Sequence, residues 1–281
     1  MSRIAYVNGV YVPLAAASVS IMDRGFQFAD SIYEVWAIRG GRMFDVVEHL
    51  ARLKRSLAEL RITPPMSETA LMLVIHEVAR RNRVRDGIVY LQISRGAASR
   101  DHTFPATSVK PTIVITGKNL DRAAIAKRAE AGIKVITVPE TRWSRRDIKS
   151  VNLLPNVLAR QQAKEAGAFE AWFVDQKGVV TEGTSSNAFI VDGEGRIRTR
   201  ALSADILHGV TRAVLLKIAR ERQMTVSETP FTVAEARAAR EAFMTGSSYA
   251  AVPIVAVDGA QIGDGRPGPV TKALRAAYLG A

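Results

Sequence analysis

The sequence predicts an α/β protein of the α+β type, built from two mixed α/β domains. Three observations support this prediction. The chain has 281 residues, beyond the size at which a single hydrophobic core usually stops growing. Its hydrophobic content is 47% and charges of both signs are interspersed, as in an ordinary globular protein. Short apolar runs typical of strands also alternate with longer amphipathic runs typical of helices.

A break in pattern divides the chain. Gly117-Lys-Asn-Leu-Asp-Arg follows an apolar strand and continues neither periodicity, so we interpret residues 118–130 as the interdomain connection. This interpretation gives an N-terminal α/β domain at residues 1–117 and a C-terminal domain at residues 131–281.

The first domain is predicted to contain a hairpin, three strands and two helices. Asn8-Gly9 lies between two apolar runs and favours a two-residue hairpin turn. Phe44–Leu60 places its apolar residues along one stripe, as a helix does. The predicted elements are the hairpin at 4–12, strands at 32–38, 87–94 and 111–116, and helices at 44–60 and 68–81.

The second domain is predicted to open with a strand at residues 133–139. A helix follows with Asn152 as its cap and Pro155 in its first turn, and it ends at Gly167. The later predicted elements are a hairpin strand that ends near 182, helices at 206–221 and 231–240, strands from 242 and at 252–257, and a terminal helix.

The charge balance is strongly basic, with 39 Lys and Arg, 27 Asp and Glu, and a net charge of +12. Such a balance raises the possibility of nucleic-acid binding. The densest basic run, residues 80–85, ends an amphipathic helix, where cations suit the dipole, and no zinc-finger or RRM signature accompanies it. We therefore expect no nucleic-acid partner. The lack of cysteine excludes a disulfide framework and a thiol nucleophile, and no spacing typical of a metal site is found.

Residues 4–22 carry no formal charge and follow Arg3, a pattern that also occurs in signal peptides. The turn signal at Asn8-Gly9 and the helix-breaking Pro13 favour a folded edge hairpin instead. No other apolar run has the length of a membrane span. We expect a cytoplasmic protein with no membrane partner.

Lys149 and Glu182 are the leading candidates for chemistry. Lys149 precedes a predicted helix start and lies close in sequence to Arg145 and Arg146, and nearby cations disfavour a protonated amine. Glu182 lies at the end of a predicted hairpin strand. Taken alone, either residue is most often a solvated side chain.

The motifs around these two residues are specific in combination. They are Asp-Ile-Lys-Ser-Val-Asn, then Glu-Ala near a strand, then Val-Thr-Glu-Gly-Thr-Ser-Ser-Asn. Together they resemble the pyridoxal-phosphate enzymes of the branched-chain and D-amino-acid aminotransferase superfamily, the class IV aminotransferases. The resemblance implies the fold-type IV architecture, with pyridoxal 5′-phosphate between the two domains. It also implies that Lys149 holds the cofactor covalently and is the catalytic base, and that Glu182 pairs with the pyridine nitrogen.

Two helices are implied to bind the cofactor. Glu48-His-Leu-Ala-Arg-Leu looks like the family's phosphate-binding helix, which assigns Arg52 to the phosphate, although periodicity alone predicts a solvated Arg52. Ile206-Leu-His-Gly-Val-Thr-Arg resembles the family's phosphate cup. There the N–H groups of Val210 and Thr211 suit a phosphate, and Leu207 is expected on the pyridine face.

A third cofactor contact is expected at Thr-Gly-Ser-Ser, where Gly246 and Ser247 permit close backbone approach to a phosphate. The family often carries a hydroxyl residue where this chain has Gly246. Only its backbone N–H is therefore expected to contribute.

The substrate carboxylate is assigned to three residues. Tyr33 lies in a segment similar to the family strand whose tyrosine faces the cofactor, although a strand tyrosine is usually a core residue. Arg100 and His102 resemble the carboxylate trap of D-amino-acid aminotransferases, a pair that reaches the neighbouring subunit's active site. The resemblance implies a homodimer with shared active sites that transfers amino groups between D-amino acids, such as D-alanine and D-glutamate, and 2-oxo acids.

Three alternatives remain open. An L-branched-chain aminotransferase has the same fold but lacks the Arg-x-His pair, and aminodeoxychorismate lyase would release pyruvate without an oxo-acid acceptor. A basic nucleic-acid-binding or scaffold protein that has lost its chemistry would not require Lys149 and Glu182.

Overall fold

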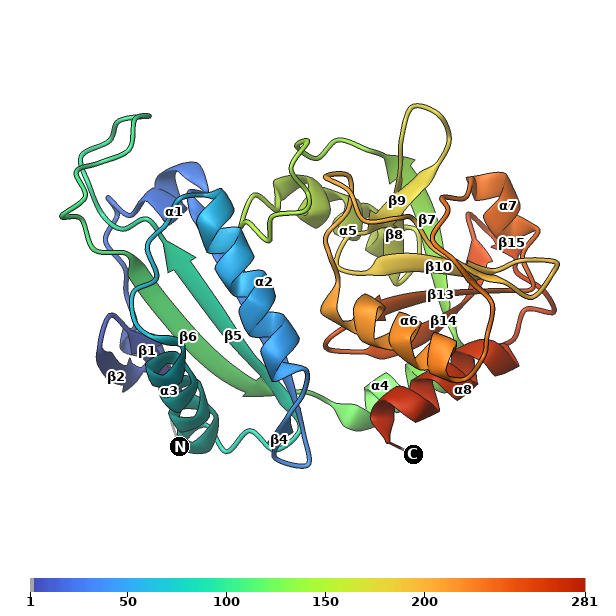
Figure 1. Ribbon diagram of the computed structural model, residues 1–281, viewed down its shortest axis with the longest axis horizontal. Helices are drawn as coiled ribbons and strands as arrows, with labels where there is room; N and C mark the ends of the chain where they lie inside the picture. The colour runs from blue at the N-terminus through green and yellow to red at the C-terminus, as the bar shows by residue number, and fades with distance from the viewer. Residues whose placement is uncertain (1–2, 281) are drawn as a thin grey trace. The chain divides into compact units, whose positions relative to one another are not determined.

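The computed structural model describes residues 3–280 and divides them into two compact units (Figure 1). The first unit contains the chain up to Asp121 together with Ile148–Asn152, and the second contains Arg122–Asp147 and the chain from Leu153. The short segment that carries Lys149 is therefore part of the first unit, although the chain on both sides of it is part of the second.

The first unit is a six-stranded antiparallel sheet of order β2-β1-β6-β5-β3-β4, with α2 and α3 on one face (Figure 1). Its strands are β1 (Ile4–Val7), β2 (Val10–Pro13), β3 (Ser31–Arg39), β4 (Arg42–Met43), β5 (Gly87–Ser94) and β6 (Thr112–Asn119). Its helices are η1 (Leu14–Ala16), α1 (Arg24–Phe28), α2 (Val46–Glu59) and α3 (Glu68–Arg81).

Alternation along β5 explains how this sheet builds its core. Val89, Leu91 and Ile93 are fully buried, whereas Tyr90 and Gln92 between them are only half-buried. Successive side chains of a strand point to opposite faces, so the buried set lies on the face that the helices cover. The predicted hairpin is confirmed: Asn8 and Gly9 both have positive φ, at 46° and 101°, and connect β1 to β2.

The second unit is a nine-stranded mixed sheet of order β12-β11-β10-β13-β14-β7-β8-β9, with β15 paired to β14. Its strands are β7 (Ile133–Pro139), β8 (Glu170–Val174), β9 (Val180–Gly183), β10 (Asn187–Val191), β11 (Ile197–Arg198), β12 (Val226–Ser227), β13 (Glu241–Gly246), β14 (Ala250–Val257) and β15 (Ala260–Gln261). Its helices are α4 (Arg122–Ala131), α5 (Leu154–Glu165), α6 (Val210–Glu221), α7 (Val233–Arg237) and α8 (Pro269–Leu279).

Two apolar layers lie on opposite faces of this sheet. In β10 and β13, Phe189 and Phe243 stack at 4.7 Å and pack with residues of α6 and α8. Their neighbours Ile190 and Met244 pack instead with Trp172 and other residues of the second layer. The alternation fixes the register of the two strands, because a slip by one residue would exchange the faces.

Residues 118–130 are not the irregular connection that we expected. β6 continues to Asn119, and α4 begins at Arg122. The passage between the units is therefore short, at Asp121 and Arg122. α4 has almost no apolar stripe and buries only Ala129, which explains why periodicity did not reveal it.

Two helix starts also differ from the prediction. α5 is preceded by Leu153, without a side-chain cap, so the predicted cap at Asn152 is wrong; Pro155 does lie in the first turn. α6 begins at Val210, after the extended Gly209, and not at residue 206. Within residues 3–280, no helix combines the length and apolar character required to cross a bilayer.

Candidate active site

Lys149 is placed by backbone pairing with β3. The N–H of Tyr33 donates to the carbonyl of Lys149 at 3.0 Å, and Ser150 forms an antiparallel bridge with Ile32. The half-buried Lys149 side chain places its Nζ 4.1 Å from the centroid of the Tyr33 ring. The structure thus brings together two residues that the sequence separates widely, an amine and a phenol ring.

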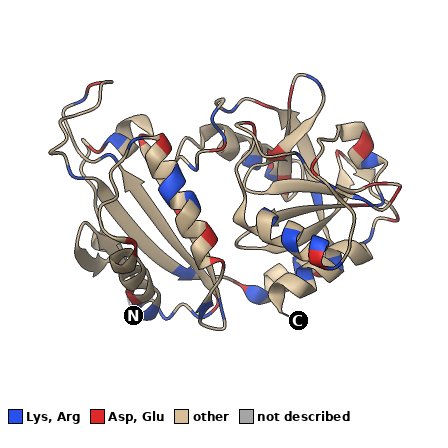
Figure 2. Cartoon of the chain, viewed as in Figure 1, with Lys and Arg blue, Asp and Glu red and all other residues tan. Residues whose placement is uncertain are grey.

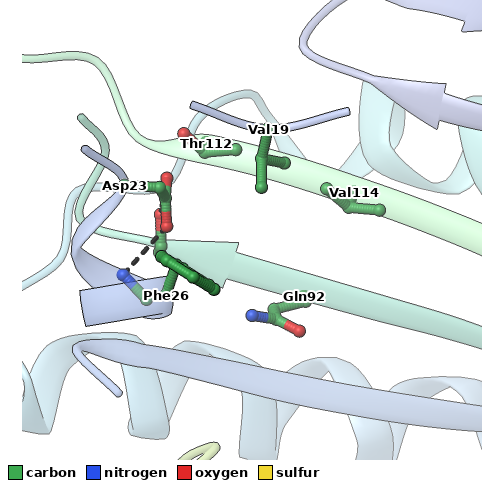
Figure 3. A pocket seen from close by; sticks show the side chains of 8 residues that line it. Val19, Asp23, Phe26, Gln92, Thr112 and Val114 are labelled. Atoms are coloured by element: carbon green, nitrogen blue, oxygen red, sulfur yellow. Dashed lines mark hydrogen bonds between the residues drawn. The ribbon is translucent and has the colours of Figure 1, made fainter. Parts of the chain in front are cut away.

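Tyr33 is supported from the neighbouring strand. Its ring stacks on that of Tyr90 at 5.7 Å, and the Tyr90 hydroxyl donates to Gln92 at 2.8 Å. Burial and the proximity of Tyr33 raise the pKa of Tyr90 to about 12, so Tyr90 remains a neutral donor. Gln92 also lines a cavity of about 330 Å³ on this face of the sheet, together with Asp23 and Phe26 (Figure 3).

Arg52 is buried, and the expectation of a solvated side chain from helical periodicity is wrong. Its Nε lies 3.0 Å from Oε2 of Glu34, and its Nη2 lies 2.5 Å from Oε1. Nδ1 of His49 lies 3.0 Å from the same Glu34 carboxylate. Burial would raise the pKa of Glu34, but the Arg52 charge and the His49 hydrogen bond outweigh it, so the pKa is lowered.

Glu34 therefore fixes one edge of the Arg52 guanidinium. No sequence motif indicated this role, because Glu34 lies on β3 and Arg52 on α2, 18 residues apart. Its position directly after Tyr33 couples the strand that carries the tyrosine to the arginine assigned to the phosphate.

Arg100 and His102 meet on one aromatic ring. The guanidinium carbon of Arg100 lies 5.0 Å from the centroid of Phe28, and the His102 ring lies 5.3 Å from the same centroid. Both residues are exposed, in the segment that follows β5. The two members of the predicted carboxylate trap therefore lie on the same small platform.

Glu182 is buried on β9 and is surrounded by donors. Nη1 of Arg142 lies 2.6 Å from Oε1, Nδ2 of Asn187 lies 3.0 Å from Oε2, and the Leu207 N–H lies 3.1 Å from both oxygens. Burial raises the pKa of Glu182, and Arg142 opposes that rise only in part. Arg142 and Asn187 are functional residues that sequence reasoning missed.

The start of α6 has the features of an anion site. Gly209 provides no side-chain cap, and the first helical residues, Val210 and Thr211, are buried. The hydroxyls of Thr211 and of Thr245, at the end of β13, are buried without a hydrogen-bond partner. Such orphaned hydroxyls are costly unless a further acceptor binds there, so this part of the site fits a phosphate group.

Two glycines beside this region differ in the room around them. A Cβ on Gly209 would lie 1.9 Å from Oδ1 of Asn187, whereas a Cβ on Gly246 would meet only the Ser185 carbonyl, at 3.4 Å. Gly246 and the half-buried Ser247 begin the tight connection from β13 to β14. Gly209 is thus required by the Asn187 contact, while Gly246 is not required by sterics.

The basic residues that drew attention in the sequence are mostly paired. Arg145 binds Asp147, and Arg146 binds Asp205 at 2.7 Å, so neither acts as a bare cation. Glu77 binds both Arg80 and Arg81 at 2.7 Å, and acidic and basic residues are interspersed in Figure 2. Among residues 3–280, no His, Asp and Glu side chains are grouped so as to hold a metal ion.

The predicted site residues fall into two sets, one in each unit. Tyr33, Arg52, Arg100, His102 and Lys149 belong to the first unit. The second unit contains those that surround the buried carboxylate and the start of α6: Glu182, Leu207, Val210, Thr211, Gly246 and Ser247.

Comparisons with known proteins identify the family. Residues 31–257 match the family described as amino-transferase class IV. The chain is 38% identical over 274 residues to D-alanine aminotransferase of Staphylococcus haemolyticus, covering 97% of this chain and 95% of that protein. It is 39% identical over 270 residues to D-alanine aminotransferase of Bacillus licheniformis, covering 96% and 94%.

Solved structures agree with this result. The branched-chain amino acid aminotransferase of Escherichia coli has a TM-score of 0.92 at 26% identity and covers 100% of this chain and 94% of that one. A branched-chain amino acid aminotransferase from T.th., solved with pyridoxamine 5′-phosphate, has a TM-score of 0.89 at 26% identity, over 99% and 93%. The resemblance and fold class inferred from the sequence are confirmed, and the chain belongs to the class IV aminotransferase family.

Proposed function

We propose that this chain is a pyridoxal-phosphate-dependent aminotransferase that moves amino groups from D-amino acids to 2-oxo acids. The observation that carries the D-amino-acid assignment is the shared packing of Arg100 and His102 on Phe28. Identity of 37–39% to D-alanine aminotransferases over nearly the whole chain supports it.

Lys149 is the proposed catalytic base. Pyridoxal phosphate, when bound, supplies an aldehyde that condenses with amines and a ring that accepts electrons from the substrate Cα. The Lys149 amine is released when substrate binds, takes the proton from Cα and returns it on the other side of the transfer. The Tyr33 ring, 4.1 Å from Nζ, keeps this amine in place.

Glu182 is proposed to hold a proton on the ring nitrogen. Donors from Arg142, Asn187 and Leu207 keep the buried carboxylate oriented and ionised against the effect of burial. A charge held in this way favours a protonated ring, which is the better electron acceptor.

The cofactor phosphate is assigned to both units. Arg52, oriented by Glu34, would bind it from one side, and the start of α6 with Thr211, Gly246 and Ser247 would donate hydrogen bonds from the other. The orphaned hydroxyl of Thr211 supports this assignment, and that of Thr245 adds a donor that the sequence did not suggest.

We further propose a homodimer in which Arg100 and His102 hold the substrate carboxylate of the partner's site. Both side chains are exposed in the single chain, as a role across an interface requires. Ile21 and Phe26 of the first unit, 77% and 73% exposed, are large apolar residues that a second subunit would cover. A cytoplasmic location stays a prediction.

The L-branched-chain activity is a second candidate, because branched-chain enzymes have the same fold with TM-scores up to 0.92. A half-reaction separates the two. Purified holoenzyme is mixed with D-alanine, D-glutamate or L-leucine, and the absorbance band of the lysine-bound cofactor is followed as it converts to the pyridoxamine form. Conversion with a D-amino acid and not with L-leucine is expected. The reverse result would assign the enzyme to the branched-chain class, and pyruvate release without an oxo-acid acceptor would indicate the lyase.

A further inference from the structure

We propose that Asp30 and Arg24 position the carboxylate-binding pair, so that the affinity for substrate carboxylates depends on an ion pair that does not itself touch substrate. The inference rests on the role proposed above for Arg100 and His102. It concerns the segment from Arg95 to Phe104, which connects β5 to the pair and lies within the first unit.

Asp30 joins two guanidinium groups. Its Oδ2 lies 2.8 Å from Nε of Arg24 and 2.7 Å from Nε of Arg95, and its Oδ1 lies 2.9 Å from Nη2 of Arg95. The three side chains are only 12%, 4% and 10% exposed, respectively for Asp30, Arg24 and Arg95. Burial would raise the pKa of Asp30, but the hydrogen bonds from Arg95 and Arg24 lower it, which keeps the carboxylate ionised.

Arg24 transmits this constraint to the pair. Its Nη1 donates to the carbonyl of Asp101 at 2.6 Å, and Asp101 is the residue between Arg100 and His102. Its backbone N–H also donates to the carbonyl of Gly96 at 2.9 Å. One arginine therefore holds both the start of the loop and the peptide that orients the two side chains.

Arg95 holds the base of the same loop. Its Nη1 and Nη2 donate to the carbonyls of Arg61 and Leu60, at 2.9 and 2.7 Å. Its guanidinium carbon lies 3.7 Å from the centroid of Phe104, so the chain beyond His102 is also attached to this arginine. The loop is thus held on both sides of the pair by groups that share Asp30.

Phe28 completes the arrangement. The guanidinium carbon of Arg24 lies 4.8 Å from its ring centroid, and Arg100 and His102 contact the same ring. Because Phe28 ends α1 and Asp30 follows two residues later, one short segment supplies both the ring and the carboxylate.

Only a guanidinium can make these contacts together, since Arg24 uses Nε for Asp30 and Nη1 for Asp101 in one planar fork. A lysine at position 24 has a single nitrogen and must lose one of the two. An asparagine at position 30 keeps the shape of the side chain but leaves two buried cations without a carboxylate. Both changes release the loop and leave Lys149, Tyr33 and Glu182 unaltered.

The test compares Arg24→Lys and Asp30→Asn holoenzymes with wild type. We expect KM for D-alanine and for 2-oxoglutarate to rise about 10-fold, as expected for loosened positioning groups, with kcat within about 3-fold. The inhibition constant of propionate, which has the carboxylate but no amine, should rise in parallel with KM. The dissociation constant of pyridoxal phosphate should not change. A fall in kcat or in cofactor affinity with unchanged KM and propionate inhibition would overturn the inference.

A double-mutant cycle separates positioning from general damage. In an Arg100→Ala background, Asp30→Asn should have almost no further effect on KM, because the group that it positions is gone. Equal effects of Asp30→Asn in both backgrounds would refute the proposal. Glu77→Gln is the matched control: its carboxylate also binds two arginines, on α3, and its loss should leave KM unchanged.

The cycle also distinguishes this inference from the proposed function. If Arg100→Ala itself leaves KM and propionate inhibition unchanged, the carboxylate trap is misassigned. If Arg100→Ala raises both constants and neither Arg24→Lys nor Asp30→Asn does, only the positioning role is wrong. Arg24→Lys keeps the positive charge and carries the test should Asp30→Asn not fold.

Discussion

Nη1 of Arg142 lies 2.6 Å from Oε1 of Glu182, and neither side chain is more than 6% exposed. The same arginine binds Glu140 through Nη2 at 2.5 Å. A single cation therefore lies between two buried carboxylates. The proton affinity of the acid assigned to the ring nitrogen depends on this contact, since Arg142 is the principal group that opposes the effect of burial on Glu182.

Replacing Arg142 with methionine should expose that dependence. The variant leaves two buried carboxylates without their cation, and we expect the free energy of unfolding to fall by about 3–5 kcal/mol. The rise in the pKa of Glu182 would then be unopposed, so the acidic limb of kcat/KM should move to higher pH. Urea unfolding and a pH–rate profile measure the two effects, and an unmoved acidic limb would show that Arg142 does not control Glu182.

Glu182→Gln should separate catalysis from binding. The amide retains the shape of the carboxylate but cannot hold a charge beside the ring nitrogen. We expect kcat to fall about 100-fold, the usual scale for loss of one electrostatic contact, with a much smaller change in cofactor affinity. Single-turnover rates with D-alanine and equilibrium binding of pyridoxal phosphate test this, and equal losses in both would contradict the assignment.

Gly209→Ala should disturb the site, because its Cβ would lie 1.9 Å from Oδ1 of Asn187. Asn187 must then move, and with it a donor to Glu182. We expect a loss of stability of about 1–3 kcal/mol together with weaker cofactor binding. Gly246→Ala is the control, since its Cβ meets only a carbonyl at 3.4 Å. Similar effects of the two variants in thermal unfolding would refute the steric argument.

Glu34→Gln should change stability in a pH-dependent manner. The pKa of Glu34 in the folded state lies below its ordinary value of 4.5, so the ionised group stabilises the fold above pH 4.5, and this contribution is lost as the pH falls towards the folded value. The variant should be less stable than wild type by about 3 kcal/mol at pH 7, and the difference should shrink below pH 4.5. A difference that is constant between pH 7 and pH 3.5 would exclude this origin.

The same substitution tests the aim of Arg52. If Glu34 orients the guanidinium towards the phosphate, Glu34→Gln should weaken binding of pyridoxal phosphate but not of pyridoxal, which has no phosphate. Equal weakening of both ligands would place the effect elsewhere in the site.

Lys149→Ala should abolish turnover, to below about one part in a thousand of wild type, because no other amine is placed to carry the Cα proton. Borohydride reduction followed by mass spectrometry should find cofactor attached to wild type and not to the variant. Lys164→Ala, at an exposed position in α5, is the control and should keep full activity.

Local patterns were sufficient for much of the fold. The Asn8-Gly9 turn, the stripe of α2 and the alternation of β5 depend on near neighbours, so periodicity and turn chemistry predicted them. The start of α6 was less accurate, since Leu207 to Gly209 are extended in order to present the Leu207 N–H to Glu182. A contact between distant residues determines that boundary, and no local pattern records it.

The candidate site divides in the same way. Lys149 and Glu182 were found through their motifs, but Arg142, Glu34 and Asp30 were not. Each of these three acts by neutralising a charge on another element, and a single sequence does not contain the distances that pair them. The buried Arg52 was misjudged for this reason: its helix position indicated solvent, whereas a carboxylate from β3 holds it inside.

The excursion of Ile148–Asn152 into the first unit makes the chain cross between the units three times, after Asp121, after Asp147 and after Asn152. The first unit therefore cannot be produced as one continuous fragment that retains its nucleophile. A single cut between Asp121 and Arg122 would leave the two pieces joined by the strand-like pairing of residues 149–151 with β3. Such a nicked enzyme should remain associated, and two separately expressed pieces should regain activity when mixed.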